Sequence, residues 1–150
     1  MNKILIETSA WIEYFKGNEK YLFLDILLDQ NRVCTNDIIL SELLPSITHK
    51  KELGLAGLLT SIYTFPLTID WNEIRAFQLT NFKNGNNNIG ISDIIIAQNS
   101  IQNNLEIVTE DKHFRLMASY LPLTFFDENS LNSITQNESN TPRHPCHGAS

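Results

Sequence analysis

The chain has 150 residues, of which 42% are hydrophobic and 19% are charged, a composition typical of one soluble globular domain. Its formal net charge of −6 argues against a broad basic surface, which proteins usually need for non-specific contact with nucleic acid. No apolar run approaches the roughly 20 residues that span a bilayer, and the start Met1-Asn2-Lys3 is not that of a signal peptide, so we expect a cytoplasmic protein without a membrane partner.

Strand-like and helix-like segments alternate along the chain, which predicts an α/β protein with a parallel sheet covered by helices. The expected strands are residues 3–6, 33–35, 63–67, 106–108 and 123–126. The expected helices are residues 9–16, 20–30, 37–48, 53–61, 71–81, 93–103 and 113–120, with Asn36, Asp70 and Ser92 as N-caps.

The composition changes near the end of the chain. From Asn129 onward Ser, Asn, Thr, Pro and Gln dominate and little apolar surface is left to bury. We therefore expect one domain over residues 1–131 and a disordered tail over residues 132–150.

Four carboxylates stand where an apolar strand ends or an apolar helix runs. Glu7 follows the first strand and Asp111 follows the strand that ends at Val108, and open parallel sheets bind their ligands at the carboxyl ends of strands. Asp93 lies in the first turn of a helix. Glu42 lies on a helix that is apolar nearly all round, so we expect it to have no easy access to water.

Each acid alone has an ordinary explanation. Glu7 could cap the next helix, and a buried Glu42 could form a salt bridge. Asp93 could complement a helix dipole, worth about 0.3–1 kcal/mol, and Asp111 could be a solvated turn residue. As a set, however, hard oxygen ligands suit Mg²⁺ or Mn²⁺, and carboxylates this close would resist ionisation without a cation. The set predicts one divalent-metal site.

Four sequence blocks resemble the PIN domain, and within it the VapC-like ribonuclease toxins of type II toxin–antitoxin modules. They are ordered and spaced as in that family and cover about residues 1–127. The blocks are residues 4–12 (ILIETSAWI), 36–44 (NDIILSELL), 90–97 (GISDIIIA) and 108–114 (VTEDKHF).

The resemblance implies a three-layer α/β/α sandwich around a parallel sheet. It also implies an endoribonuclease that needs Mg²⁺ or Mn²⁺, cleaves RNA with a transfer RNA as the first candidate, is neutralised by a small VapB-like antitoxin and forms a homodimer. Carried over by position, the catalytic metal-site residues would be Glu7, Glu42, Asp93 and Asp111. Hydroxyls that orient these acids or the attacking water would be those of Thr8, Ser9 and Thr109.

Aromatic residues on the first two helices are candidate contacts for an antitoxin or a second subunit, with packing in the core as the alternative for each. These residues are Trp11, Tyr14, Phe15, Tyr21 and Phe23.

Two positions depart from the family pattern. Glu7 replaces an Asp, and the extra methylene moves the carboxylate by up to roughly 1.5 Å. A misplacement of about 1 Å can lower a rate on the order of a hundredfold. His113 stands where many members have a further acid, and we interpret it as a helix N-terminal residue in preference to a metal ligand or a phosphate contact.

Two other functions compete with the nuclease. The first is a catalytically impaired PIN-like module that binds RNA or antitoxin, because Glu7 disables the metal site. The second is a phospho-accepting receiver domain, which needs an acid pair after the first strand and a Lys after the last strand. The chain has neither at Glu7-Thr8 or near Phe125, which argues against this second alternative.

Overall fold

The computed structural model describes residues 2–132, which contain a five-stranded, wholly parallel sheet in the order β3-β2-β1-β4-β5. In the register of the central strands, Leu5 pairs with Cys34 on one side and with Ile107 on the other. The strands are β1 Ile4–Ile6, β2 Val33–Thr35, β3 Tyr63–Thr64, β4 Glu106–Val108 and β5 Thr124–Phe125.

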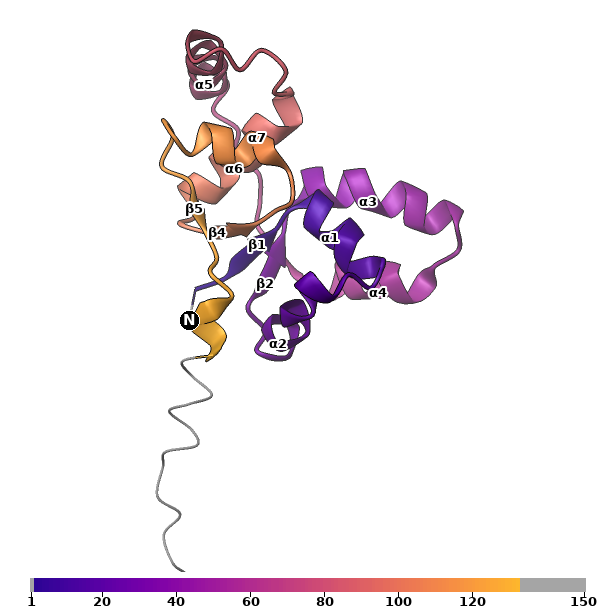
Figure 1. Cartoon of the computed structure of the whole chain (residues 1–150). Coiled ribbons are helices and arrows are strands. Elements are labelled where there is room, and N and C mark those ends of the chain that lie inside the picture. The colour runs from indigo at the N-terminus through magenta and orange to yellow at the C-terminus, as the bar shows by residue number, and fades with distance from the viewer. Residues whose placement is uncertain (1, 133–150) are drawn as a thin grey trace, which may run out of the picture.

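Helices cover both faces of this sheet. Figure 1 shows α1, α3 and α4 to the right of the strands, α2 below them, and α5 to α7 above and to the left. Right-handed crossovers explain this, since the chain steps outward from β1 to β3 on one side and then returns to β4 and β5. The helices are α1 Thr8–Phe15, α2 Phe23–Asp29, α3 Asp37–His49, α4 Leu53–Ser61, α5 Trp71–Lys83, α6 Ile91–Gln102 and α7 Lys112–Met117, with a 3₁₀ turn at Glu19–Tyr21.

The predicted α/β/α sandwich with a central parallel sheet is confirmed. The order 3-2-1-4-5 also differs from the 2-1-3-4-5 order of receiver domains, which removes that alternative. The predicted tail over residues 132–150 lies outside the described residues except for Asn132, and stays a prediction.

The core is built around β1 and α6. All three residues of β1 are fully buried. Every residue of α6 from Ile94 to Ser100 is fully or almost fully buried. Burying one such Ile side chain stabilises the fold by about 1.5–3 kcal/mol, so these two elements form a rigid base for whatever lies at their ends.

A buried amide pair joins α3 to α6. Asn36 caps α3 by accepting the backbone N–H of Ile39 on its side-chain oxygen at 3.1 Å. Its side-chain nitrogen donates to the Asn99 side chain at 3.1 Å, and Asn99 in turn donates to the Pro66 carbonyl. Both amides are almost completely buried, so this link fixes the helix that carries Glu42 relative to the helix that carries Asp93.

Some local predictions differ from the structure. The helix expected over residues 20–30 is divided at Leu22 into a 3₁₀ turn and α2. Helix α3 passes Pro45 and ends at His49, close to the predicted end, because the carbonyl that loses its partner belongs to the exposed Ser41 and can bind water. Ser92 is not an N-cap, since α6 begins at Ile91 with Gly90 in the cap position.

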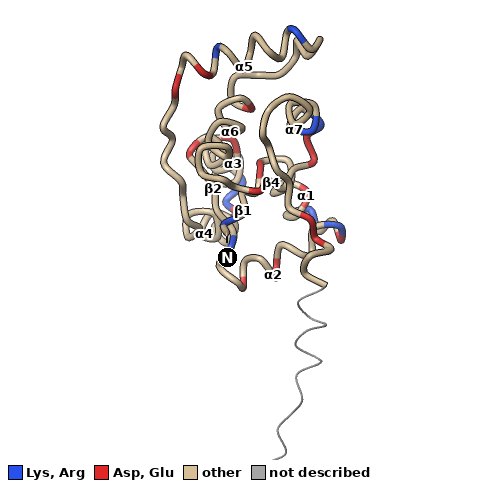
Figure 2. Tube along the Cα trace, turned by 90° about the vertical axis from the view of Figure 1, so that its left-hand side faces the viewer, with Lys and Arg blue, Asp and Glu red and all other residues tan. Residues whose placement is uncertain are grey.

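Trp11 and Tyr21, two of the candidate contact aromatics, are buried in the core, while the other three are partly buried against it. Among residues 2–132 no helix is both long and apolar enough to cross a membrane. In Figure 2, the Lys and Arg positions are scattered over several elements rather than gathered on one face.

Candidate metal centre

The centre lies where β1 and β4 end side by side. The backbone N–H of Glu7 donates to the Val108 carbonyl at 2.9 Å, which continues the β1–β4 pairing by one step. The residues that follow each strand, Glu7 to Ser9 and Thr109 to Asp111, therefore meet at one edge of the sheet. This is the edge at which open parallel sheets bind ligands.

Glu7 is almost completely buried, and its carboxylate is held by its own neighbours. Oxygen Oε2 accepts the Ser9 backbone N–H at 3.0 Å, the Ser9 hydroxyl, and the Thr109 hydroxyl at 2.7 Å. The first of these bonds makes Glu7 the N-cap of α1. Burial raises the pKa of Glu7, the hydroxyls and the backbone N–H lower it, and the nearby charge of Asp111 raises it.

The same two hydroxyls fix the loop after β4. Thr109 Oγ1 donates to Glu7 and accepts the backbone N–H of Asp111 at 2.9 Å. Ser9 Oγ accepts the backbone N–H of Glu110 at 2.9 Å. The loop that carries Asp111 is thus tied to the loop that carries Glu7.

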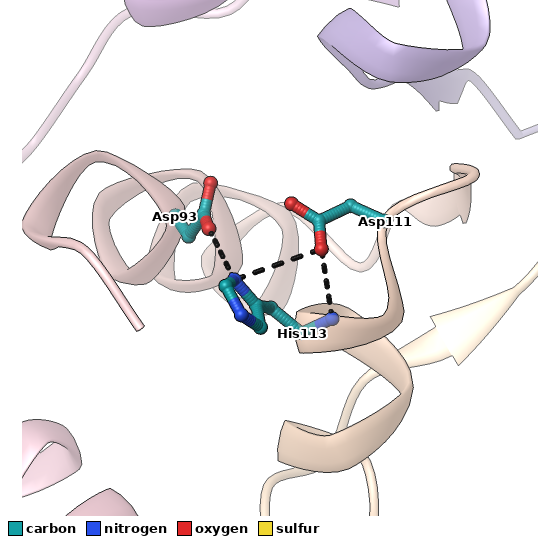
Figure 3. Close-up of side chains that lie close together, drawn as sticks. All are labelled: Asp93, Asp111 and His113. Atoms are coloured by element: carbon teal, nitrogen blue, oxygen red, sulfur yellow. Dashed lines mark hydrogen bonds and ion pairs between the residues drawn. The ribbon is translucent and has the colours of Figure 1, made fainter. Parts of the chain in front are cut away.

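Asp93, Asp111 and His113 point toward one another (Figure 3). His113 Nδ1 lies 3.2 Å from Asp93 Oδ2 and 3.6 Å from Asp111 Oδ1. One ligand atom of each residue lies within 4.8 Å of those of the other two, and among residues 2–132 this is the one group of acids, His or Cys that converges so closely. The three side chains are 16%, 29% and 25% exposed, in that order, so an ion could reach them from solvent.

The interpretation of His113 as a helix N-terminal residue holds for its backbone but does not account for its side chain. It does lie in the first turn of α7, and its backbone N–H is capped by Asp111 Oδ1 at 2.9 Å. Its imidazole, however, faces both aspartates. Sequence reasoning could have found it from its place two residues after Asp111, where many relatives have an acid.

Glu42 approaches the group from α3. Its Oε1 accepts the Thr8 hydroxyl at 3.1 Å. Partial desolvation of the carboxylate raises the pKa of Glu42, Thr8 lowers it, and the charges of Asp93 and Asp111 raise it. The expectation that Glu42 cannot reach water is wrong, because α3 buries only the face with Ile39, Leu43 and Ile47 and leaves Glu42 exposed.

The structure therefore divides the four predicted acids. Asp93 and Asp111 converge with His113, and Glu42 is close enough for its pKa to respond to both aspartates. Glu7 lies beside them but does not belong to the converging group. Thr8, Ser9 and Thr109 contact Glu42 and Glu7.

The donor set fits a divalent cation. Burial raises the pKa of Asp93, His113 lowers it, and the charge of Asp111 raises it. A cation between the aspartates would remove the like-charge repulsion, and carboxylate oxygens are the ligands that Mg²⁺ and Mn²⁺ prefer.

Comparison with known proteins agrees with this geometry. The sequence profile of the PIN domain family matches residues 4–119. The chain belongs to the PIN domain family. A search among curated proteins found no match to this PIN domain.

Two solved structures resemble this PIN domain in fold. A DNA-bound VapBC from Salmonella typhimurium has a TM-score of 0.66 and 17% identity over 85% of this chain and 99% of that chain. VapBC2 from Rickettsia felis, bound to a DNA fragment from its promoter, has a TM-score of 0.64 and 18% identity over 82% of this chain and 96% of that chain.

Proposed function

We propose that this PIN domain is a cytoplasmic, metal-dependent endoribonuclease of the VapC type that is neutralised by a small antitoxin. The observation that carries the proposal is the convergence of Asp93 and Asp111 at the carboxyl edge of the sheet, with Glu42 facing them from α3. The similarity in fold to two VapBC structures supports the antitoxin part.

The chain's own residues divide the work as follows. Asp93 and Asp111 would hold Mg²⁺ or Mn²⁺, and the ion would supply Lewis-acid chemistry and charge to screen the phosphate. Glu42 is exposed and has a raised pKa, which suits a group that accepts a proton from the attacking water. Ser9 and Thr109 hold Glu7, and Thr109 also holds the loop of Asp111.

The substrate class is RNA, with a transfer RNA as the first candidate. The scattered basic residues and the net charge of −6 give little general attraction for phosphate. Binding would therefore depend on the metal centre and on contacts to a particular RNA shape, so we expect cleavage at few sites rather than general degradation.

A purified-protein assay tests the nuclease. The chain, Glu7→Asp and Asp93→Asn are incubated with a transfer RNA pool in Mg²⁺, Mn²⁺ or EDTA. We expect cleavage by the first two proteins, none by Asp93→Asn and none in EDTA. Absence of cleavage by every form would exclude the nuclease.

One observation favours a second candidate function, a catalytically impaired module that binds RNA or antitoxin. Three donors occupy Oε2 of Glu7, where the family has a shorter Asp. Cleavage by Glu7→Asp alone, with RNA binding by both forms, would support this second function.

A cavity between α1 and the α3–α4 hairpin supports an antitoxin contact. It has a volume of about 430 Å³ and is lined by apolar side chains together with charged and polar ones, among them Glu42. An apolar partner segment that fills it would lie next to the proposed acid site and block access. Its lining includes Ile12, Phe15, Leu43, Ile47 and Leu55.

Co-expression with a small reading frame directly upstream of the gene tests this partner. We expect the two proteins to co-purify, and Ile12→Arg, which places a charge in the cavity, to abolish the complex without unfolding the chain. Light scattering on the same samples tests the proposed homodimer.

A further inference from the structure

We propose that His113 is a direct metal ligand through Nδ1 and takes the place of Glu7 in the ligand set, so that the site selects Mn²⁺ over Mg²⁺. The inference rests on the proposed metal-dependent function. It concerns two positions at which this chain departs from the PIN family pattern, and it treats the two departures as one compensated change.

The first argument is the spacing of the ligand atoms. Two ligands about 2.1 Å from one ion and at right angles to each other lie about 3.0 Å apart. His113 Nδ1 is 3.2 Å from Asp93 Oδ2 and 3.6 Å from Asp111 Oδ1, close to that value. Two of the three pairs thus have the spacing of neighbouring ligands, and the ligand atoms of all three residues lie within 4.8 Å of one another.

The second argument is that hydrogen bonding alone does not account for the triad. One ring nitrogen carries at most one hydrogen, and the 3.6 Å separation from Asp111 is too long for a hydrogen bond. An N–H of His113 can thus serve Asp93 but leaves Asp111 without this partner. A cation among the three atoms satisfies both carboxylates and the nitrogen lone pair.

The third argument is that an oxygen of Glu7 is already occupied. Its Oε2 accepts the N-cap bond of α1 and two hydroxyls, so direct ligation by that oxygen would compete with three hydrogen bonds. Through Thr109, which accepts the backbone N–H of Asp111, Glu7 instead positions a ligand. We infer that Glu7 is a positioning residue and that the centre is displaced from β1 toward α7.

The metal preference follows from the ligand type. Mg²⁺ takes almost only oxygen ligands, whereas ions further along the first transition row bind imidazole increasingly well. Two carboxylates and one imidazole therefore favour Mn²⁺. An all-carboxylate site at the same place would distinguish the two ions much less.

Pulsed EPR of Mn²⁺ bound to the full-length apoprotein tests the proposal without an activity assay. We expect nitrogen coupling from a directly bound imidazole, and a change in that coupling when the histidines are labelled with ¹⁵N. The coupling should disappear in His113→Asn. It should persist in His49→Asn, where the His is exposed at the end of α3, and in His144→Asn/His147→Asn, which removes the tail histidines.

Titrations with each ion test the selectivity. We expect His113→Asp to lower the Mn²⁺ to Mg²⁺ affinity ratio on the order of tenfold or more, the lower end of the losses in affinity that changes around a bound metal cause. Glu7→Gln should change Mn²⁺ affinity by less than about threefold, while Asp93→Asn should abolish binding.

The outcomes separate this inference from the proposed function. Mn²⁺ binding without nitrogen coupling in the unmodified protein, or a Glu7→Gln loss as large as that of Asp93→Asn, would overturn the inference and leave a metal-dependent nuclease. Absence of Mn²⁺ and Mg²⁺ binding altogether would overturn both. Because the coupling is measured on the unmodified protein, a His113 variant that failed to fold would not prevent the decision.

Discussion

Asp111 uses one carboxylate oxygen for two purposes, since Oδ1 accepts the backbone N–H of His113 at 2.9 Å and also lies 3.6 Å from that residue's Nδ1. The first contact is the N-cap of α7, and the second places the carboxylate in the proposed metal centre. A short helix and a ligand group are thereby built from the same two residues.

A pair of substitutions separates these two purposes. Asn caps helices as well as Asp does, so Asp111→Asn should keep the stability of the metal-free protein close to its original value while metal binding is lost. Asp111→Ala should also lose the cap, at a cost of about 0.5–2 kcal/mol. Urea unfolding in EDTA and a Mn²⁺ titration measure both effects. Equal stability of the two variants would show that the cap contributes nothing.

The raised pKa of Asp93 predicts a pH-dependent stability. The ordinary pKa of Asp is 3.8, and burial raises the pKa of Asp93 in the folded protein. At a pH between these two pKa values, the folded state binds more protons than the unfolded state. The contribution of Asp93 to stability is therefore full below pH 3.8 and is lost as the pH rises through the pKa of the folded state.

Asp93→Asn should therefore be more stable than the unmodified protein in EDTA at neutral pH, and the difference should shrink as the pH falls below the ordinary Asp range. With saturating Mn²⁺ the order should reverse, because only the unmodified protein gains from binding. Unfolding free energies at several pH values, with and without metal, measure this. A variant that is less stable at neutral pH in EDTA would contradict the assigned direction.

Much of the fold could be predicted because local and tertiary signals agree. The segment Ile4 to Ile6 is apolar throughout and is followed by an acid. A continuous apolar run is typical of a parallel strand that has helices on both faces of its sheet. Helix α4 has the predicted bounds, Leu53–Ser61. The division at Leu22 could not be predicted, since the same apolar spacing continues through the 3₁₀ turn and α2.

The candidate centre was harder to predict in its details. Glu42 lies on a helix with apolar residues on most sides, but the α3–α4 hairpin projects from the sheet and is covered on one face only (Figure 1). The direction of the His113 ring depends on how α7 packs against α6, which is a tertiary property. For Glu7 the sequence shows the longer side chain but not its return to Ser9.

Thr109 links Glu7 to Asp111, and its removal should affect both stability and metal binding. Thr109→Val keeps the shape but leaves the Asp111 backbone N–H without its partner and removes one of the three donors of the Glu7 carboxylate, at a cost of about 1–3 kcal/mol. Thr109→Ser keeps the hydroxyl and is the matched control. The free energy of unfolding, measured in EDTA, and the Mn²⁺ affinity should both fall in the Val variant. Both should stay near the original values in the Ser variant. Identical behaviour of the two variants would mean that the hydroxyl is not a link.

The amide pair Asn36–Asn99 should couple strongly. Asn36→Ala removes the α3 cap and takes away the donor to the buried Asn99 side-chain oxygen, so we expect a loss of about 2 kcal/mol or more. A double-mutant cycle with Asn99→Ala measures the coupling, and additive effects would show that the pair does not act as a unit.

Glu7→Asp tests how far the departure at Glu7 limits the enzyme. Asp also serves as an N-cap, so the bond from the Ser9 backbone N–H and α1 should remain intact, while the shorter side chain gives up its bonds to the Ser9 and Thr109 hydroxyls and brings the carboxylate to the position usual in the family. Placement errors of about 1 Å change rates on the order of a hundredfold, and we expect a gain in RNA cleavage of up to that size. Single-turnover rates in Mn²⁺ measure it, with Glu7→Ala as the control that removes both cap and carboxylate. A rate for Glu7→Asp equal to or below that of the unmodified protein would mean that Glu7 already serves this site as well as the shorter acid.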